Sequence, residues 1–294
     1  MSEEPASTAS EALGDDGLAD ALTAIDETAP LVHHLTNDVT TSETANVTLH
    51  WGGLPVMADA PAEAGDMATG ADAVVINTGT ASSVDVDAMI DAGQRANETD
   101  VPVVLDPVGY GATPHRVESV GRLLDAVAFD VIKGNVGEIR GLAGEEATVK
   151  GVESVDDAVD GSGVVDAARA LAAESGATVV ASGSRDVVTD ADGTAYELAV
   201  GHERMGSFVG SGCMLASTLG TVAALTREPD ATISTATEAA LVATAAYGLA
   251  GEQAAATEPP GPASYRTAFM DAIAAMAADP SGVDAALGDR LSKL

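Results

Sequence analysis

The feature that most constrains the fold is an alternation of short apolar runs with segments of helical periodicity. The apolar runs are predicted strands: Leu54–Ala58, Ala73–Asn77, Val101–Asp106, Asp130–Lys133 and Thr178–Ser182. Helical patterns separate them: Thr40–Trp51, Ala62–Ala68, Asp85–Asn97, Pro114–Leu124, Val136–Leu142 and Val164–Ser175. Short, continuously apolar strands are typical of a sheet covered on both faces. The alternation therefore predicts an α/β fold with right-handed βαβ units and a mainly parallel sheet.

The rest of the chain departs from this alternation. Asp192-Gly193 lies between two β-rich runs within Asp186–Val200, which predicts a hairpin and hence antiparallel strands at one edge of the sheet. The last third is predicted helical over Gly210–Leu225, Thr235–Ala256 and Tyr265–Ala278. We expect one domain over residues 17–294, beginning with a helix at Gly17–Thr28, preceded by an acidic, flexible tail at residues 1–16.

The charge is strongly negative: 13 Lys and Arg residues stand against 46 Asp and Glu residues, a net charge of -33. Such a surface repels nucleic acids and anionic membranes, so we expect neither as a partner. The sequence shows no signal peptide and no apolar run long enough to span a bilayer. A single cysteine cannot form an internal disulfide. These features predict a cytoplasmic protein.

The stretch Met205–Ala224 contains a glycine-rich turn, Gly210-Ser211-Gly212, followed by Cys213 and a run of small and apolar residues. A turn of this kind that opens a helix leaves backbone N–H groups free at the positive end of the helix dipole. Such an arrangement binds anions, typically phosphate. The alternative is a tight turn that leads into a buried helix.

Polar residues follow several of the predicted strands, where ligands bind in open α/β sheets. Asp106 has the chemistry to hold Mg²⁺, or to form an Asx-turn or cap. Lys133, one of only three lysines, has the charge to bind a phosphate. Glu138 either faces a metal ion or completes a capping box with Asn135. Ser182 and the glycine after it suit a nucleotide or a simple turn equally well.

Two further residues come from the first part of the chain. Leu31–Asn46 is polar and rich in hydroxyl groups, and it enters a helix at about Thr40. Asn37 or Thr40 in this stretch has the groups to hydrogen-bond a small ligand. Met57 ends a predicted strand, where methionine is either part of the core or the floor of an apolar pocket. The P-loop motif and the G-x-S-x-G elbow are both absent from the sequence.

Taken together, these segments resemble the successive motifs of the hydroxyethylthiazole kinase family, in the same order and at the same spacing. The matching segments are LTNDVTTSETAN, GLPVMADAPAEA, VVINTGT, VVLDPVGYGATPHR, IKGNVGEI and GSGCMLAS. The resemblance covers about residues 20–280. It implies a ribokinase-like, three-layer α/β/α fold and ATP- and Mg²⁺-dependent phosphorylation of 4-methyl-5-(2-hydroxyethyl)thiazole for thiamine biosynthesis or salvage. It also implies a homotrimer with the pocket near subunit interfaces.

The resemblance assigns roles to individual residues. It places the substrate beside Met57, Gly210 and Asn37, ATP beside Lys133, Ser182 and Gly212, the metal beside Asp106 and Glu138, and the reacting hydroxyl beside Cys213. Three positions depart from the family pattern: Lys133 stands where the family has Arg, and Ser182 and Ser211 stand where it has Thr. Lysine keeps the charge but lacks the bidentate fork of arginine, which affects phosphate geometry.

Three rival functions remain open at this point. An NAD(P)HX dehydratase shares the fold but has Asp where Cys213 stands, so the cysteine argues against it. A hydroxymethylpyrimidine kinase is a nearer rival, although TNDVT and PVMADAP favour the thiazole enzyme. A nucleotide or thiazole sensor without activity is disfavoured, because the motifs are intact. A helix N-terminus lowers the pKa of a thiol. A thiol of lowered pKa can accept the hydroxyl proton, but a loose transition state demands little base strength, so we expect Cys213 mainly to orient the hydroxyl and to assist modestly as a base.

The charge leads to a prediction about salt. Because a net charge of -33 repels itself, folding requires screening, as in proteins of halophiles that work in a salt-rich cytosol. We expect the thermal midpoint to be higher in molar KCl than in low salt. Thermal melts at the two salt concentrations check this, and equal or greater stability in low salt would contradict it.

Overall fold

The computed structural model describes residue 13 and residues 16–145, 162–228, 233–287 and 290–294. Most of the predicted acidic tail, residues 1–12 and 14–15, therefore lies outside the described residues. A nine-stranded sheet organises the chain in the order β2-β1-β3-β4-β5-β6-β7-β8-β9. The strands are β1 (Leu31–Leu35), β2 (Leu54–Val56), β3 (Ala73–Asn77), β4 (Val103–Asp106), β5 (Val131–Asn135), β6 (Thr178–Ser182), β7 (Asp186–Thr189), β8 (Ala195–Leu198) and β9 (Leu291–Lys293).

Strands β1 to β6 pair in parallel, and β7 to β9 pair antiparallel at one edge. The predicted hairpin is confirmed: β7 and β8 are joined by a turn in which Gly193 has a φ of 84°. The amide of Thr194 donates to Asp190 Oδ1 at 2.8 Å and closes this turn. The mainly parallel sheet with an antiparallel edge is thus as the sequence predicts.

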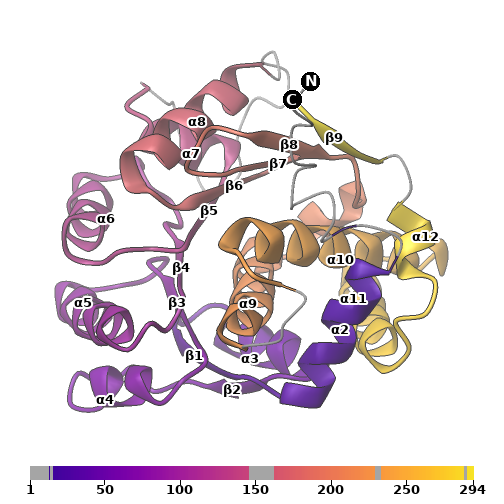
Figure 1. Cartoon of the computed structure of the whole chain (residues 1–294), viewed down its shortest axis with the longest axis horizontal. Helices are drawn as coiled ribbons and strands as arrows, with labels where there is room; N and C mark the ends of the chain where they lie inside the picture. The colour runs from indigo at the N-terminus through magenta and orange to yellow at the C-terminus, as the bar shows by residue number, and fades with distance from the viewer. Residues whose placement is uncertain (1–12, 14–15, 146–161, 229–232, 288–289) are drawn as a thin grey trace, which may run out of the picture.

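Helices cover both faces of the sheet (Figure 1). One layer holds α4 (Ala64–Thr69), α5 (Ser83–Glu98), α6 (Pro114–Ala126), α7 (Val136–Leu142) and α8 (Ser162–Ser175). The other holds α2 (Gly17–Thr28), α3 (Thr41–His50), α9 (Ser211–Ala223), α10 (Ala236–Ala256) and α11 (Pro262–Ala278). Shorter elements are η1 (Glu203–Ser207), η2 (Ala224–Arg227) and α12 (Val283–Leu287).

Alternate residues of each central strand pack into different layers. On β3, Val74 and Ile76 belong to the core under α4–α8, whereas Val75 belongs to the core under α9 and α10. All three side chains are at most 1% exposed. This two-sided burial explains why the central strands read as continuous apolar runs. It confirms the three-layer α/β/α architecture.

Three elements differ from the sequence prediction. Strand β1 was not expected, because its sequence LVHHL carries two histidines at its centre. Both are buried, and burial lowers the pKa of His33 and brings that of His34 down to about 4, so the rings are neutral core residues. The other two elements, α12 and β9, were not predicted either. Both elements are short, so they contain too few residues to show a periodic sequence pattern.

The register of the sheet positions the carboxyl ends of its central strands side by side. Asn77, the last residue of β3, pairs with Asp106, the last residue of β4. Asn135 at the end of β5 pairs with Ser182 at the end of β6. Polar residues that are far apart in the sequence therefore gather along one edge of the sheet.

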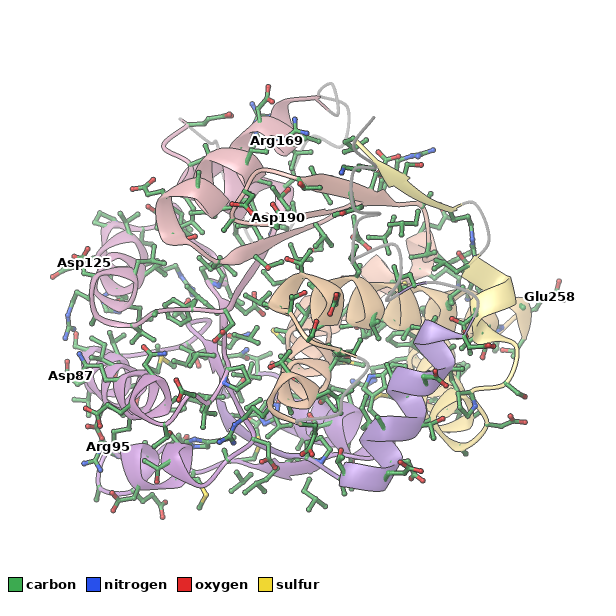
Figure 2. The ribbon with its side chains drawn as sticks, in the orientation of Figure 1. Asp87, Arg95, Asp125, Arg169, Asp190 and Glu258 are labelled. Atoms are coloured by element: carbon green, nitrogen blue, oxygen red, sulfur yellow. The ribbon has the colours of Figure 1, made fainter. Side chains whose placement is uncertain are left out.

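Charged residues project from the outer helices, as Asp87, Arg95 and Asp125 do in Figure 2. Arg95 pairs with Asp66 at 2.9 Å and with Asp91 at 3.2 Å, and all three side chains are at least two-fifths exposed. Exposed pairs of this kind contribute little to stability. The acidic surface therefore affects stability mainly through solvation of the charged groups and through screening by salt.

Gly220 and Gly121, both inside helices, allow a matched stability test. A Cβ on Gly220 would lie 2.4 Å from Val75 Cγ2 on β3, whereas a Cβ on Gly121 of α6 meets nothing within 4 Å. We expect Gly220→Ala to lower the free energy of unfolding by about 1–3 kcal/mol through overpacking. We expect Gly121→Ala to raise it by about 0.5–1 kcal/mol, because alanine favours helix.

Denaturant unfolding in molar KCl, followed by circular dichroism, measures both changes. Stabilisation of equal size by the two substitutions would show that α9 does not pack against β3 as closely as described.

Candidate active site

The centre of the candidate site is a buried ion pair between two neighbouring strands. Lys133 Nζ on β5 lies 3.3 Å from Asp106 Oδ1 at the end of β4, and the two side chains are 4% and 0% exposed. Asn77 Nδ2 donates to the other carboxylate oxygen, Asp106 Oδ2, at 2.8 Å. Both oxygens of Asp106 are therefore engaged, as a carboxylate away from water requires.

A chain of amides connects this pair to the cysteine. Asn37 follows β1, is 4% exposed, and donates through Nδ2 to Asn77 Oδ1 at 3.0 Å. The same Nδ2 group lies 3.4 Å from Cys213 Sγ. Asn37 Oδ1 in turn accepts the backbone N–H groups of Val39 and Thr40, which lead into α3. Asn37 is thereby fixed from both ends, and it sets the position of the thiol.

Helix α9 begins at the same place. Its N-cap, Gly210, has a φ of 98°, and a Cβ there would lie 2.9 Å from Thr40 Cγ2, so both conformation and space favour glycine. The first backbone bond runs from Met214 N to Gly210 O, at 2.8 Å. Among the described residues, the amides of residues 211–213 have no acceptor. They are the free N–H groups expected at a helix start.

The lysine points at this helix start. A Cβ on Gly212 would lie 2.9 Å from Lys133 Nζ, so glycine leaves room for the ammonium group beside the first turn of α9. Tyr247 on α10 anchors the turn by donating its hydroxyl to Ser211 O at 2.6 Å. An ammonium group, three free amides and the positive end of a helix dipole converge here. Their combined field favours an anion.

The electrostatics of the site follow from this burial. Burial raises the pKa of Asp106 to about 6, an effect that the charge of Lys133 partly offsets. Burial opposes the charge of Lys133, but the carboxylates of Asp106 and Glu138 outweigh it and hold the pKa of the ammonium group above its ordinary value. Both partners are therefore ionised at neutral pH.

The cysteine behaves differently from our expectation. We expected the helix N-terminus to lower the pKa of its thiol, but burial and the nearby Asp106 charge raise it. Cys213 is only 9% exposed, and at neutral pH it is a neutral thiol. The expectation was wrong because it considered the helix alone, without the burial of the thiol and the carboxylate of Asp106.

Glu138 and Ser182 lie along the same edge. Glu138 on α7 forms the predicted capping box with Asn135, and its other oxygen, Oε1, accepts the amide of Gly109 at 2.7 Å. This bond ties α7 to the loop that follows Asp106. Ser182, at the end of β6, donates its hydroxyl to Gly134 O at 3.3 Å. The Glu138 carboxylate is close enough to the ion pair to raise the pKa of both Asp106 and Lys133, whereas Ser182 lies opposite Asn135 on the adjacent strand.

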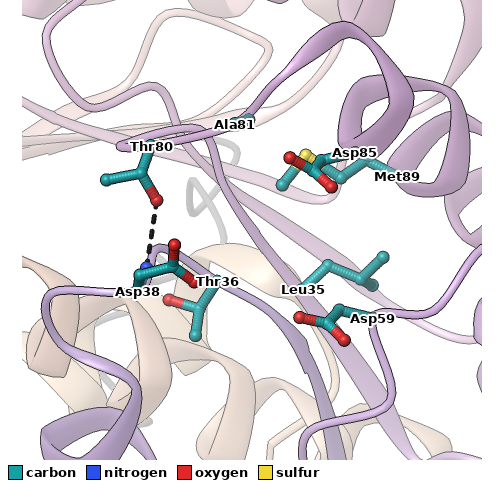
Figure 3. A pocket seen from close by; sticks show the side chains of 8 residues that line it. All are labelled: Leu35, Thr36, Asp38, Asp59, Thr80, Ala81, Asp85 and Met89. Carbon is teal, nitrogen blue, oxygen red and sulfur yellow. Dashed lines mark hydrogen bonds between the residues drawn. The ribbon is translucent and has the colours of Figure 1, made fainter.

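Met57 follows a strand that is separated from the ion pair by β1 and β3 in the order of the sheet. It follows β2, the edge strand, whereas Asp106 ends β4 in the interior of the sheet. A small cavity of about 40 Å³ lies nearby, at the ends of β1 and β3, and Asp38, Asp59 and Asp85 line it (Figure 3). This acidic cavity does not include Cys213 or Lys133. Within the described part of the chain, no three acidic, His or Cys side chains form a metal-binding cluster.

Two important residues were not predicted. Asn77 connects Asn37 to Asp106, and its position at a strand end in VVINTGT was an available signal. Arg116 joins two loops by donating to Val108 O and Gly79 O, each at 2.6 Å. Nothing in the local sequence indicates these bonds, because both acceptors are backbone carbonyls of other loops.

The sequence matches the model of the hydroxyethylthiazole kinase family over residues 22–279. A hydroxyethylthiazole kinase of Natronomonas pharaonis is 47% identical over 269 residues, which cover 90% of this chain and 94% of that protein. One from Haloquadratum walsbyi is also 47% identical and covers 86% of this chain and 85% of its own length.

The chain is also similar to a solved structure of a hydroxyethylthiazole kinase protein. The hydroxyethylthiazole kinase protein of Pyrococcus horikoshii OT3 superposes with a TM-score of 0.80 at 32% identity, over 94% of this chain and 98% of that one. An ADP/ATP-dependent NAD(P)H-hydrate dehydratase of Bacillus subtilis has a TM-score of 0.52 at 13% identity, which indicates a shared fold alone. No helix among the described residues has the length and apolar character that crossing a bilayer demands.

The buried ion pair leads to a prediction about stability. Removing one partner leaves the other charge uncompensated, so Asp106→Asn and Lys133→Met should each cost about 3–5 kcal/mol of unfolding free energy. The double variant should lose much less than the sum, because no buried charge remains.

Denaturant unfolding of all four proteins in molar KCl completes the cycle. Additive losses would contradict the pairing of these two side chains.

Proposed function

The chain belongs to the hydroxyethylthiazole kinase family, and we propose that it transfers the γ-phosphoryl group of ATP to the hydroxyl of 4-methyl-5-(2-hydroxyethyl)thiazole, a step in thiamine biosynthesis. The observation that carries the proposal is the convergence of Lys133, the free amides of α9 and Cys213. Phosphoryl transfer depends mainly on positioning and on charge stabilisation. This site supplies both, although the chain as a whole has a net charge of -33.

The transferring group is proposed to lie at the start of α9. Its equatorial oxygens carry the charge of the transition state, and donors fixed in advance stabilise that charge without reorganisation. The amides of residues 211–213 are held by the Gly210 turn and by the Tyr247 anchor. Lys133 adds a full positive charge that Asp106 orients. Gly212 permits the close approach of the lysine, which a larger residue would block.

Cys213 is proposed to orient the substrate hydroxyl. Because its thiol is neutral, it can donate or accept one hydrogen bond, but it is a weak base. A loose transition state requires little base strength, since the hydroxyl proton is lost late. Asn37, which contacts Cys213 Sγ, holds the thiol in place. The same position makes Asn37 and Gly210 the proposed contacts of the substrate, with Met57 completing the apolar side of the pocket.

Mg²⁺ is the proposed metal, and the residues present fit it as a hydrated ion. Each oxygen of Asp106 and Glu138 already accepts one hydrogen bond, but a carboxylate oxygen can accept a second. Mg²⁺ keeps several waters when bound, so these oxygens would hold it through its water shell. Bound there, Mg²⁺ would neutralise phosphate charge. Asp106 and Glu138 hold their orientation through backbone and side-chain donors that do not depend on the metal.

The nucleotide is proposed to extend from Lys133 toward β6 and β7. Ser182 and Gly183 form a turn there, and the amide of Gly183 donates to Asp186 Oδ1 at 3.0 Å. Burial raises the pKa of Asp186 to about 7, although the residue keeps part of its surface in solvent. The turn is thereby fixed close to the phosphate end of the site, with the serine hydroxyl at its start.

Exposed apolar side chains bear on the oligomeric state that we propose for the protein. Large apolar side chains are exposed on and beside α3, β2 and the start of α9: Val39, Leu49, Leu54 and Val209 are 63%, 53%, 49% and 68% exposed. Apolar exposure of this kind supports a homotrimer whose neighbouring copy closes the pocket near Met57. The acidic surface supports function in a salt-rich cytoplasm, with no nucleic acid or membrane as partner.

The role proposed for Cys213 is tested by two substitutions. Cys213→Ala should slow turnover by less than about 10⁴-fold, the upper range for loss of a general base. Cys213→Asp should retain or raise activity, because a carboxylate both orients the hydroxyl and accepts its proton. Steady-state kcat and KM for the thiazole alcohol measure the effect. An inactive Asp variant that still folds and binds ATP would count against the role.

The identity of the substrate is tested by ATP consumption with the thiazole alcohol, with hydroxymethylpyrimidine, and with neither. Consumption only with the thiazole alcohol is expected. Equal consumption with the pyrimidine would favour the related pyrimidine kinase activity. No consumption with either alcohol, by a folded protein that binds ATP, would favour a sensor.

A further inference from the structure

A second cavity lies outside the proposed active site, between the β3–α5 loop and the start of α6. Its volume is about 150 Å³, and its lining includes Thr78, Thr80, Thr113, His115, Arg116 and Ser119. No carboxylate lines it, although the chain has a net charge of -33. The cavity in Figure 3 shares Thr80 and Ala81 with it but is lined by three aspartates. The two neighbouring cavities thus have opposite electrostatic character.

The start of α6 supplies donors to this second cavity. Pro114 occupies the first helical position and has no N–H, and Thr113 Oγ1 accepts the amide of Arg116 at 3.3 Å. Among the described residues, the amide of His115 has no acceptor. Arg116 uses one N–H of each terminal nitrogen to hold Val108 O and Gly79 O, which leaves further guanidinium donors. The cavity therefore adjoins a fixed cation and the positive end of a 13-residue helix.

A buried hydroxyl gives an independent indication of a ligand. Ser119 is 5% exposed and its hydroxyl makes no hydrogen bond with any described residue, so its remaining surface opens on the cavity. Ser119 lies three and four residues after Arg116 and His115, on the same face of α6. Thr78, also 5% exposed, lines the cavity too, but its hydroxyl oxygen is enclosed by protein and does not face the cavity. Buried polar groups are usually satisfied, so the unpartnered Ser119 hydroxyl indicates a polar occupant.

We infer that this cavity binds a phosphate-type oxyanion, supplied either by inorganic phosphate or by a phosphate monoester. Arginine and free helix N-terminal amides match the charge and geometry of phosphate oxygens. The hydroxyl of Ser119 supplies an additional donor. This site is separate from the transfer site, although the two are connected: the amide of Gly79, a cavity residue, donates to Asn77 Oδ1 at 3.0 Å.

Two substitutions test the site, with one matched control. His115→Asp places a carboxylate at the cavity mouth, on an exposed residue in the first turn of a helix, where acidic residues are tolerated. Ser119→Val removes the buried hydroxyl. Arg122→Gln is the control: it changes the net charge by the same amount as His115→Asp, but on an exposed side chain of α6 that pairs with Asp87.

Phosphorus NMR titration in molar KCl measures binding of inorganic phosphate and of methyl phosphate to the full chain. We expect His115→Asp and Ser119→Val each to weaken binding by about tenfold or more, and Arg122→Gln to leave it unchanged. Binding of methyl phosphate as well as phosphate would identify monoesters as ligands, and binding of phosphate alone would restrict the site to the free ion.

No binding by the wild-type chain would overturn the inference. So would equal binding by all four proteins, because phosphate would then occupy only the transfer site. If Ser119→Val fails to fold, His115→Asp still gives the answer, since its side chain is exposed. Neither residue belongs to the proposed transfer site, so failure here leaves the kinase proposal standing.

Discussion

The buried pair of Asp106 and Lys133 is the interaction on which the site depends. An ammonium group away from water needs a partner, and Asp106 supplies one from the adjacent strand at 3.3 Å. The carboxylate needs a second donor, and Asn77 supplies it from the strand on the other side. Through Asn37 the same chain of bonds reaches the thiol of Cys213. One requirement, satisfying a buried charge, therefore positions groups from five different segments of the chain.

This arrangement reconciles the proposed binding of a triphosphate with the strongly acidic character of the protein. The outer helices present carboxylates to solvent, where salt screens them within about 10 Å at modest ionic strength. Lys133 is buried, so its field is screened far less, and the amides of α9 act at the same point. The second cavity beside Arg116 repeats the arrangement on a smaller scale. Cationic character is concentrated where anions must enter and is absent from most of the surface.

Much of this could be predicted from local sequence, and the limits have physical causes. Strands β3 and β6 and helix α7 match their predicted bounds, because period and composition are local properties. Asp106 and Ser182 were placed at strand ends for the same reason, whereas Lys133, predicted to end its strand, lies inside β5, which continues to Asn135. Which of them contact one another depends on strand register, as with Asn77 opposite Asp106, and no local pattern encodes register. The rise in the pKa of Cys213 comes first from burial and then from the Asp106 charge, and both depend on tertiary packing that no local pattern encodes. Strand β1 was missed because its buried histidines resemble surface residues in a sequence.

The most direct test of this account is a crystal structure of the protein with the thiazole alcohol, Mg²⁺ and a non-hydrolysable ATP analogue. The account predicts the terminal phosphate against the amides of Ser211, Gly212 and Cys213, with Lys133 Nζ in contact with it and the substrate hydroxyl beside Cys213 Sγ. A terminal phosphate bound elsewhere, or a hydroxyl remote from Cys213 in a fully occupied complex, would contradict the central claim.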